Sequence, residues 1–443
     1  MIKQFYLYFS LILFSFLAYS CENTDPSWKE NADQPELLHS SMKKLTDVIV
    51  YDIFSPPVAS RNYLYPTIGA YEIMVLKDND YVSLAGQVND LSTIPQPQQE
   101  ICYELAALSA FLELSKEVIF SVDKIDEKIE EVVKMYAETG MPKKVLNYSI
   151  TYGSEVASHI WSWAKKDNYH ETRSYPKFSV TNDPGRWKPT PPAYQAGIEP
   201  SWNLIRTTVI DSASQFQPDF PTDYDMKKGS AFYDEVIEVF NAVENAGEEE
   251  KEIASFWDCN PFVMNVSGHV MHATKKITPG GHWINIAALA CRKDSASFME
   301  SIHAYTAVSI ALFDGFISCW DEKYRSNLIR PETIINDYID EDWVPLLQTP
   351  PFPEYTSGHS VISGAAAVAL TEIFGEDFSF LDDTEMEFGL PARSFRSFYH
   401  ASEEAAISRL YGGIHYRPAI DNGVTQGRSL GKYIMTQLKF RKS

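Results

Sequence analysis

The chain has 443 residues, with 60 Asp and Glu against 38 Lys and Arg, so its formal net charge is −22. Hydrophobic residues make up 44% and charged residues 22%. This is the composition of a folded globular protein, and it excludes a disordered, collagen-like or coiled-coil chain. The acidic balance argues against a nucleic-acid binder, which needs a basic face to offset phosphate charge. It leaves room for a small anion site, because local charge placement decides that.

The N-terminus has the pattern of a secretory signal. Lys3 precedes an apolar run over residues 5–19, and Ser20-Cys21 follows. A positive charge, a short apolar stretch and a small residue at the cleavage point are typical of export. The run is shorter than the ~20 residues that span a membrane. We expect a lipoprotein signal peptide over 1–21, a lipidated Cys21, and an exported protein held at the periplasm or cell surface by that anchor alone. The alternative is an ordinary cleaved signal.

Most of the remaining sequence repeats apolar residues at three- and four-residue steps, which predicts helices. They are expected over 98–114, 121–136, 143–164, 230–243, 295–320 and 361–374. The most apolar stretch, 302–320, contains His303 and Asp314, which indicates a buried helix of a soluble protein and not a membrane span. Alternating strand patterns are scarce. The predicted fold class is all-α, a helical bundle.

Residues 183–221 interrupt this rhythm with seven prolines, and Trp187 and Trp202 lie among them. A solvated linker would be poorer in aromatic residues, so an ordered crossover packed on the helices is expected. We predict an N-terminal helical region over 22–228 that contains this crossover, and a catalytic helical bundle over 229–443. The cysteines beyond Cys21 show no C-x-x-C spacing, so thiolate metal sites are not expected. Their disulfide pairing is left open.

Three short segments of the last third carry groups suited to chemistry. In the first, Lys323 and Arg330 are seven residues apart, about two helical turns, which predicts that they share a helix face. Arg325 then points elsewhere. Pro331 disfavours helix at Arg330, so its guanidinium is expected at a helix end. Taken alone, this segment also fits a solvated basic patch.

The second segment is Thr356-Ser357-Gly358-His359, directly before the apolar helix predicted over 361–374. Ser357 is a favourable N-cap. The amides of the first turn then point outward with the positive end of the helix dipole, which forms a natural anion seat. Gly358 allows a ligand to approach the backbone closely. An ordinary helix cap with a solvent-facing His359 is the alternative.

The third segment contains Ser408-Arg409 and His415. We expect Ser402 to start a helix that carries Arg409. Gly412-Gly413 would break this helix and turn His415 back toward Arg409. The alternative is a helix C-cap with a packed histidine.

The three segments together supply fixed positive charges at Lys323, Arg330 and Arg409, and two imidazoles at His359 and His415. Arginine forks match oxyanions and lysine acts as a point charge. Histidine does acid, base or nucleophilic work near neutral pH. The set holds no carboxylate that would form a metal cage. These groups predict a site for a tetrahedral oxyanion, either phosphate or vanadate.

At these residues the chain resembles the type-2 phosphatidic acid phosphatase/vanadium haloperoxidase superfamily. The superfamily pattern K-x6-R-P, P-S-G-H, S-R-x5-H reads here as Lys323-x6-Arg330-Pro331, Thr356-Ser357-Gly358-His359 and Ser408-Arg409-x5-His415. Thr356 replaces the usual proline, which would loosen the turn. The family's aspartate four residues after the last histidine is Ala419 here, and the nearest acid is Asp421, so the partner that orients His415 is not identified.

The resemblance implies roles for these residues. His415 would be the axial vanadium ligand of a haloperoxidase or the nucleophile of a phosphatase, and His359 the general acid/base. Lys323 would also be catalytic, by polarising bound peroxide. The groups implied to hold the oxygens of the anion are Lys323, Arg330, Arg409, Ser357 and the Gly358 amide.

Two aromatic residues favour the peroxidase. Trp320 and Phe352 resemble, in position, the aromatics that flank the halide site of the fungal vanadium chloroperoxidase, and aromatic edges carry positive potential. We therefore expect a vanadate-dependent haloperoxidase that uses hydrogen peroxide and a halide, iodide or bromide. The alternatives are an exported acid phosphatase with a phosphohistidine intermediate, and a lipoprotein that only captures phosphate.

Three further features of the sequence support only minor predictions. Ser267-Gly268-His269 repeats the S-G-H string without partner motifs, so we expect it to be structural. His282 is a candidate for the pocket mouth. Asp258 is a candidate partner for Arg409.

Overall fold

The computed structural model describes residues 26–261, 263–267, 270–273 and 275–442. The predicted signal peptide with Cys21, and Gly268-His269, lie outside the described residues. The α-helices are α2 (Pro35–Tyr51), α3 (Pro56–Val75), α4 (Tyr103–Glu117), α5 (Asp123–Glu138), α6 (Lys143–Ala164), α7 (Tyr169–Thr172), α8 (Ala231–Glu244), α9 (Glu248–Phe256), α10 (Pro279–Asp294), α11 (Phe298–Ser326), α12 (Pro331–Tyr338), α13 (Gly358–Phe374), α14 (Phe398–Tyr411) and α15 (Arg417–Gln437).

The remaining elements are short. The 3₁₀ helices are η1 (Pro26–Lys29), η2 (Trp202–Leu204) and η3 (Met386–Phe388). Two antiparallel hairpins pair β1 (Met264–Ser267) with β2 (Val270–Ala273) and β3 (Phe380–Asp382) with β4 (Arg393–Phe395). The all-α prediction is confirmed.

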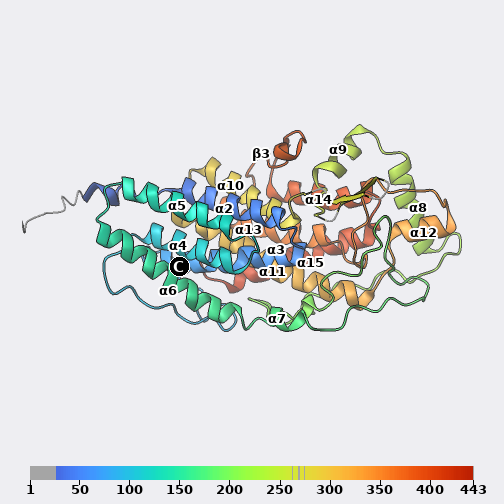
Figure 1. The fold of residues 1–443 in the computed structure, drawn as a ribbon. Helices are drawn as coiled ribbons and strands as arrows, with labels where there is room; N and C mark the ends of the chain where they lie inside the picture. Colours follow the sequence, from blue (N-terminus) through green and yellow to red (C-terminus); the bar gives the residue numbers. More distant parts are fainter. Residues whose placement is uncertain (1–25, 262, 268–269, 274, 443) are drawn as a thin grey trace, which may run out of the picture.

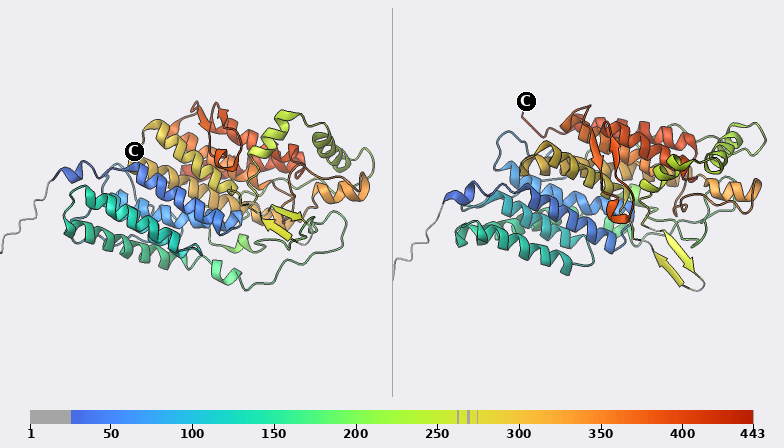
Figure 2. Two further views of the ribbon diagram at one scale, coloured as in Figure 1. Left: turned by 45° about the horizontal axis from the view of Figure 1, so that its top comes forward. Right: turned by 90° about the horizontal axis from the view of Figure 1, so that it is seen from above.

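The helices form an elongated bundle with two sides. Helices α2–α6, blue to teal in Figure 1, lie along one side, and α10, α11 and α13–α15, yellow to red, lie along the other. Helix α11 packs against both α3 and α13, so it joins the two sides. Figure 2 shows the β1–β2 hairpin projecting away from the helices. The division of the chain at residue 228 stays a prediction.

The expected helices are present, with ends shifted by a few residues. Helix α6 has the predicted bounds, and Ser230 caps α8 by accepting a hydrogen bond from the Tyr233 amide. The expectation that Ser402 starts a helix is wrong. Helix α14 begins earlier, because Ser397 accepts a hydrogen bond from the His400 amide and caps it there.

The proline-rich crossover is ordered and packed, as predicted. Trp187 and Trp202 are both 0% exposed. The buried carboxylate of Asp314, in the middle of α11, accepts hydrogen bonds from the backbone amides of residues 208–210 at 2.7–3.1 Å. The side chain of Asp314, inside the apolar core helix, thus anchors the crossover to the bundle.

Among the described residues, α11 is the one helix long and apolar enough to cross a membrane, and its most apolar stretch is entirely buried inside the protein. The prediction of a buried core helix is therefore confirmed. The four cysteines of the described chain, Cys102, Cys259, Cys291 and Cys319, are buried and unpaired.

Small residues let α13 and α15 approach closely. A Cβ atom at Gly427 of α15 would lie 2.0 Å from the carbonyl oxygen of Val361 in α13. The start of α13 is also tied to the start of α15, because the Ser357 amide donates to the Ala419 carbonyl at 3.0 Å. This packing fixes the position of the Ser357-Gly358-His359 turn.

Candidate active site

Lys323 lies in the last turn of α11 with its ammonium fully buried. The Nζ atom donates to the carbonyl oxygens of Pro353 at 3.1 Å and Glu354 at 3.0 Å, and to that of Thr356. Burial lowers the pKa of Lys323 to about 8. The loop over residues 353–356 therefore wraps around a single cation.

Arg330 reaches the same loop from a different helix. Asn327 adopts a left-handed conformation (φ 48°) that ends α11, and Arg330 is the residue before α12. The prediction that Lys323 and Arg330 share one helix face is therefore wrong. Both cations nevertheless lie 5.0 Å from the ring centroid of Phe352. The Arg330 Nε donates to the Phe352 carbonyl at 2.9 Å.

The second segment opens α13. The Ser357 hydroxyl accepts a hydrogen bond from the Ser360 amide, as the N-cap prediction requires. Gly358 and His359 follow, and both line a pocket. The Thr356 hydroxyl donates to Gln426 Oε1 at 2.8 Å. A side-chain hydrogen bond thus holds the turn where the resemblance leads one to expect a proline.

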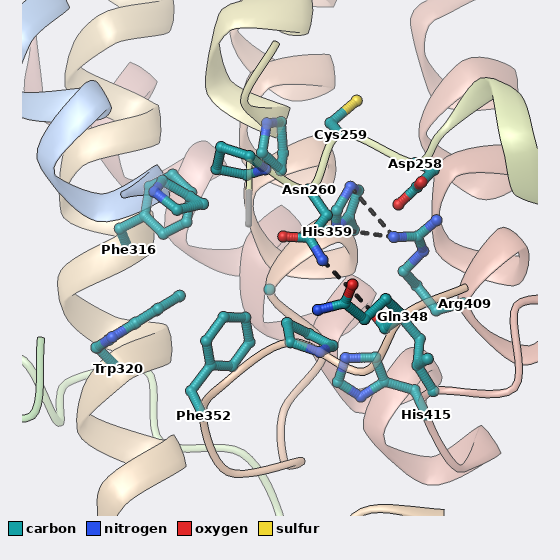
Figure 3. A pocket seen from close by; sticks show the side chains of 16 residues that line it. Asp258, Cys259, Asn260, Phe316, Trp320, Gln348, Phe352, His359, Arg409 and His415 are labelled. Carbon is teal, nitrogen blue, oxygen red and sulfur yellow. Dashed lines mark hydrogen bonds between the residues drawn. The ribbon is translucent and has the colours of Figure 1, made fainter. Parts of the chain in front are cut away.

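The third segment ends α14. Gly413 has a φ of 76°, a left-handed conformation that turns the chain after Tyr411. Arg409 and His415, on either side of this turn, line the same pocket as His359. The Arg409 Nη1 atom lies 3.4 Å from His359 Nε2 (Figure 3).

Glu354 is the site residue that sequence reasoning missed. Its Oε1 atom lies 2.8 Å from His415 Nδ1 and also accepts the Tyr416 amide at 3.0 Å. On the other side of the imidazole, His415 Nε2 lies 3.1 Å from Arg330 Nη1. A carboxylate that takes the Nδ1 proton leaves the lone pair on Nε2. In this structure that lone pair accepts a hydrogen bond from Arg330, which a ligand on Nε2 would replace.

Burial and the neighbouring charges shift the pKa values of the groups in this cluster. Burial raises the pKa of Glu354 to about 8, although Arg330 and Lys323 act in the opposite direction. Burial, then Arg330 and Lys323, hold the pKa of His415 well below its ordinary value. Burial and Arg409 likewise hold the pKa of His359 well below its ordinary value. Both imidazoles are therefore neutral at neutral pH.

The pocket has an aromatic side and a polar side. Figure 3 shows Phe316, Trp320 and Phe352 on the first side, and Arg409 and His415 on the second. The ring centroids of Trp320 and Phe352 are 5.0 Å apart. Both aromatics predicted for the halide site thus lie beside the cationic cluster.

Two arginine nitrogens indicate that an anion fits here. The Nη2 atoms of Arg330 and Arg409 are buried, and within the described part of the chain neither has a hydrogen-bond partner. A buried charged donor without an acceptor is costly. An oxyanion with several oxygens, such as vanadate, would satisfy both groups, and His415 Nε2 is available as its nitrogen ligand.

Two minor candidates have other positions than expected. His282 is fully buried behind the pocket wall, because its ring stacks on Trp257 at 4.6 Å, so its placement at the pocket mouth is wrong. Asp258 does line the pocket, and its carboxylate forms its ion pair with Lys276. It also acts electrostatically on Arg409, where it opposes the lowering of the pKa by burial. The structural role expected for Ser267-Gly268-His269 stays a prediction.

The comparisons with known proteins agree with this geometry. Residues 303–441 match the model of the VCPO second helical-bundle domain. The chain is 53% identical to the bacterial vanadium-dependent iodoperoxidase of a solved crystal structure, with a TM-score of 0.88, covering 92% of this chain and 98% of that one. No match was found among curated proteins.

Two more distant structures share the fold. Holo-type bacterial vanadium-dependent chloroperoxidase is 16% identical with a TM-score of 0.64, covering 89% of this chain and 92% of that one. The apo-type structure is also 16% identical, with a TM-score of 0.62, covering 85% and 93%.

Proposed function

Since the chain belongs to the vanadium-dependent haloperoxidases, we propose that it binds vanadate at the His415 cluster and oxidises iodide with hydrogen peroxide. The observation that carries the proposal is that Arg330 contacts His415, that Arg409 and His415 line one pocket, and that the buried Nη2 atoms of both arginines lack a partner in the described part of the chain. Glu354 beside Nδ1 of His415 favours the tautomer with the proton on Nδ1, so that Nε2 can bind a metal. Bound vanadate would supply a Lewis-acid centre that activates peroxide.

The residues around the anion have separate tasks. His415 Nε2 would be the ligand, and Arg330 and Arg409 would hold oxygens. Lys323 would act through its buried positive charge, or would exchange one of its three carbonyl hydrogen bonds for an anion oxygen. The Ser357 hydroxyl accepts a hydrogen bond from an amide, so its own proton is available for an anion oxygen. The Gly358 amide, at the first position of α13, would add a backbone donor.

His359 is placed to handle the proton of the incoming peroxide. It is half-buried in the pocket wall beside Arg409, whereas His415 is buried and bonded on both sides. Because burial and Arg409 lower the pKa of His359, its imidazole is a neutral base. We therefore assign proton transfer to His359 and anion binding to His415.

Trp320 and Phe352 support a halide beside this anion. The positive edges of the two rings suit a large, soft anion. The buried ammonium of Lys323 lies 5.0 Å from the Phe352 ring centroid and adds positive potential. Iodide is the proposed substrate because it is the easiest halide to oxidise and because the relative with 53% identity is an iodoperoxidase.

The deciding experiment uses the metal-free protein with orthovanadate, hydrogen peroxide and iodide. Triiodide absorbance should rise only when vanadate is present, and the same assay with bromide measures the preference. His415→Ala should abolish the activity, whereas His269→Ala should leave it nearly intact. A protein that forms no triiodide with vanadate, whether it hydrolyses nitrophenyl phosphate or only binds phosphate, would contradict the proposal.

We also propose that the mature protein is exported and anchored through a lipid on Cys21. The support is the sequence pattern, in which Lys3 and an apolar run over residues 5–19 precede Ser20-Cys21. Incorporation of an alkyne fatty acid into the wild type, and its loss in Cys21→Ser, would test the anchor. Partition of both proteins between detergent and water provides an independent readout.

A further inference from the structure

Behind the wall of the active-site pocket lies a buried cluster that the haloperoxidase chemistry does not use. Cys259, His282 and Glu385 are all buried, and the Sγ, imidazole nitrogen and carboxylate oxygen that they offer lie within 4.8 Å of one another. They come from the loop after α9, the first turn of α10 and the turn after β3. Three segments distant in sequence thus direct three potential metal ligands to one point.

The distances in this cluster fit a tetrahedral metal centre. Cys259 Sγ lies 3.4 Å and Glu385 Oε1 lies 3.3 Å from the same atom, His282 Nδ1. A tetrahedral zinc ion with Zn–S near 2.3 Å and Zn–N or Zn–O near 2.0–2.1 Å separates such ligands by about 3.3–3.6 Å. Glu385 Oε1 is buried and, among the described residues, has no polar partner except His282 Nδ1, with which it makes no hydrogen bond.

On the opposite side of its ring, His282 is hydrogen-bonded to a carboxylate, as metal-binding histidines usually are. His282 Nε2 lies 2.8 Å from Asp382 Oδ2, and the other oxygen of Asp382 accepts the Thr384 amide and hydroxyl. When a metal ion displaces the Nδ1 proton, a carboxylate that keeps the Nε2 proton directs the Nδ1 lone pair toward the cluster. This carboxylate–histidine pair orients the ring and raises its basicity as a ligand.

We propose that Cys259, His282 and Glu385 bind a second metal ion, a divalent ion of the zinc class, separate from the vanadate site. A thiolate, an imidazole and a carboxylate form a mixed set that suits zinc, whereas magnesium and calcium prefer oxygen ligands alone. Three protein ligands leave the fourth position for water. No sequence pattern indicates this metal site, because its ligands are spread over residues 259–385 without C-x-x-C spacing.

The proposed ion would fix one wall of the active site. Asp258, Cys259 and Asn260 all line the pocket, and Cys259 is the ligand among them. The ion would join this wall to α10 and to the β3–β4 hairpin. Its role would be to hold the pocket in shape, since oxidation of the halide takes place at the His415 cluster.

The test uses the full chain without a histidine tag. Metal analysis of the purified wild type should find zinc at one equivalent per chain. After removal of the metal, added Co²⁺ should produce the near-ultraviolet charge-transfer band of a cobalt thiolate. This band should be absent in Cys259→Ser, and Asp382→Asn should weaken cobalt binding by about 10- to 100-fold.

Cys291→Ser is the matched control, because Cys291 is a buried, unpaired cysteine of α10 outside the cluster. It should keep the zinc content and the cobalt band. The proposal is overturned if metal-free wild type shows no thiolate band with Co²⁺, whether or not the variants fold. It is also overturned if Cys291→Ser removes the band and Cys259→Ser does not.

Discussion

The imidazole of His415 and the carboxylate of Glu354 form a buried pair, with Nδ1 and Oε1 2.8 Å apart. The same oxygen also holds the amide of Tyr416, so the carboxylate fixes both the ring and the backbone behind it. Since Nε2 on the far side faces the arginine of the anion site, this pair determines how the histidine presents its lone pair.

Glu354→Gln should therefore weaken vanadate binding while the protein stays folded. Loss of a carboxylate that orients a metal-ligating histidine typically costs about 10- to 100-fold in affinity. Activity titrated against vanadate gives the apparent Kd, and circular dichroism checks the fold. Glu72→Gln is the control, because Glu72 is a buried glutamate that accepts two hydrogen bonds in α3, away from the pocket. Equal affinity in both variants would contradict the assigned role.

Anion binding should weaken above pH 8. The pKa of Lys323 in the free protein is lowered to about 8, so above this pH the ammonium must regain a proton to hold an anion. The apparent Kd should then rise by about tenfold for each pH unit. Arginine stays charged over this range. The Lys323→Arg variant should therefore bind vanadate less tightly at pH 7, but its apparent Kd should not show the extra rise above pH 8. Parallel profiles of wild type and variant would show that ionisation of Glu354 or of the vanadate, and not of Lys323, causes the change.

Phe352→Leu should affect the halide more than the anion. The ring of Phe352 packs on Trp320 at 5.0 Å and covers the cations of Lys323 and Arg330. Its loss should raise the KM for iodide several-fold and leave the vanadate Kd within about twofold, because truncating one aromatic contact removes about 0.5–1.5 kcal/mol. Steady-state kinetics at saturating vanadate separates the two constants. An unchanged KM would place the halide elsewhere in the pocket.

Gly427→Ala should destabilise the protein and lower activity. The added Cβ would lie 2.0 Å from the Val361 carbonyl oxygen and force α15 away from α13, which carries His359. Overpacking of this kind costs about 1–3 kcal/mol. Gly315→Ala is the control, because its Cβ would meet Ile362 at an ordinary 3.6 Å. Thermal melts should show a lower Tm for the first variant only.

The helices and the side chains of the candidate site could be predicted from local signals. Apolar spacing predicted α6 with its observed ends. Three short motifs supplied His359, Arg409 and His415, which line the pocket, and the buried cations Lys323 and Arg330 beside it. These signals are local because capping, helix periodicity and the motif residues all lie within a few positions of one another in the chain.

The errors came from features that depend on competing local choices or on distant contacts. Asn327 ends α11 between Lys323 and Arg330, where the seven-residue spacing had indicated one continuous helix. Ser397 and Ser402 are both acceptable caps, and packing selects the first. Glu354 could not be identified as the partner of His415 from the sequence, because it lies 61 residues earlier in the chain and no local pattern links the two.

The three carbonyl oxygens around the Lys323 ammonium have a thermodynamic consequence. They assemble the cationic site before any anion enters, so the cost of desolvating these charges falls on folding and not on binding. The protein without its anion should accordingly melt at a lower temperature than the loaded protein, by an amount that grows with anion concentration. Part of the affinity for the anion would then come from neutralising buried positive charges that destabilise the empty protein.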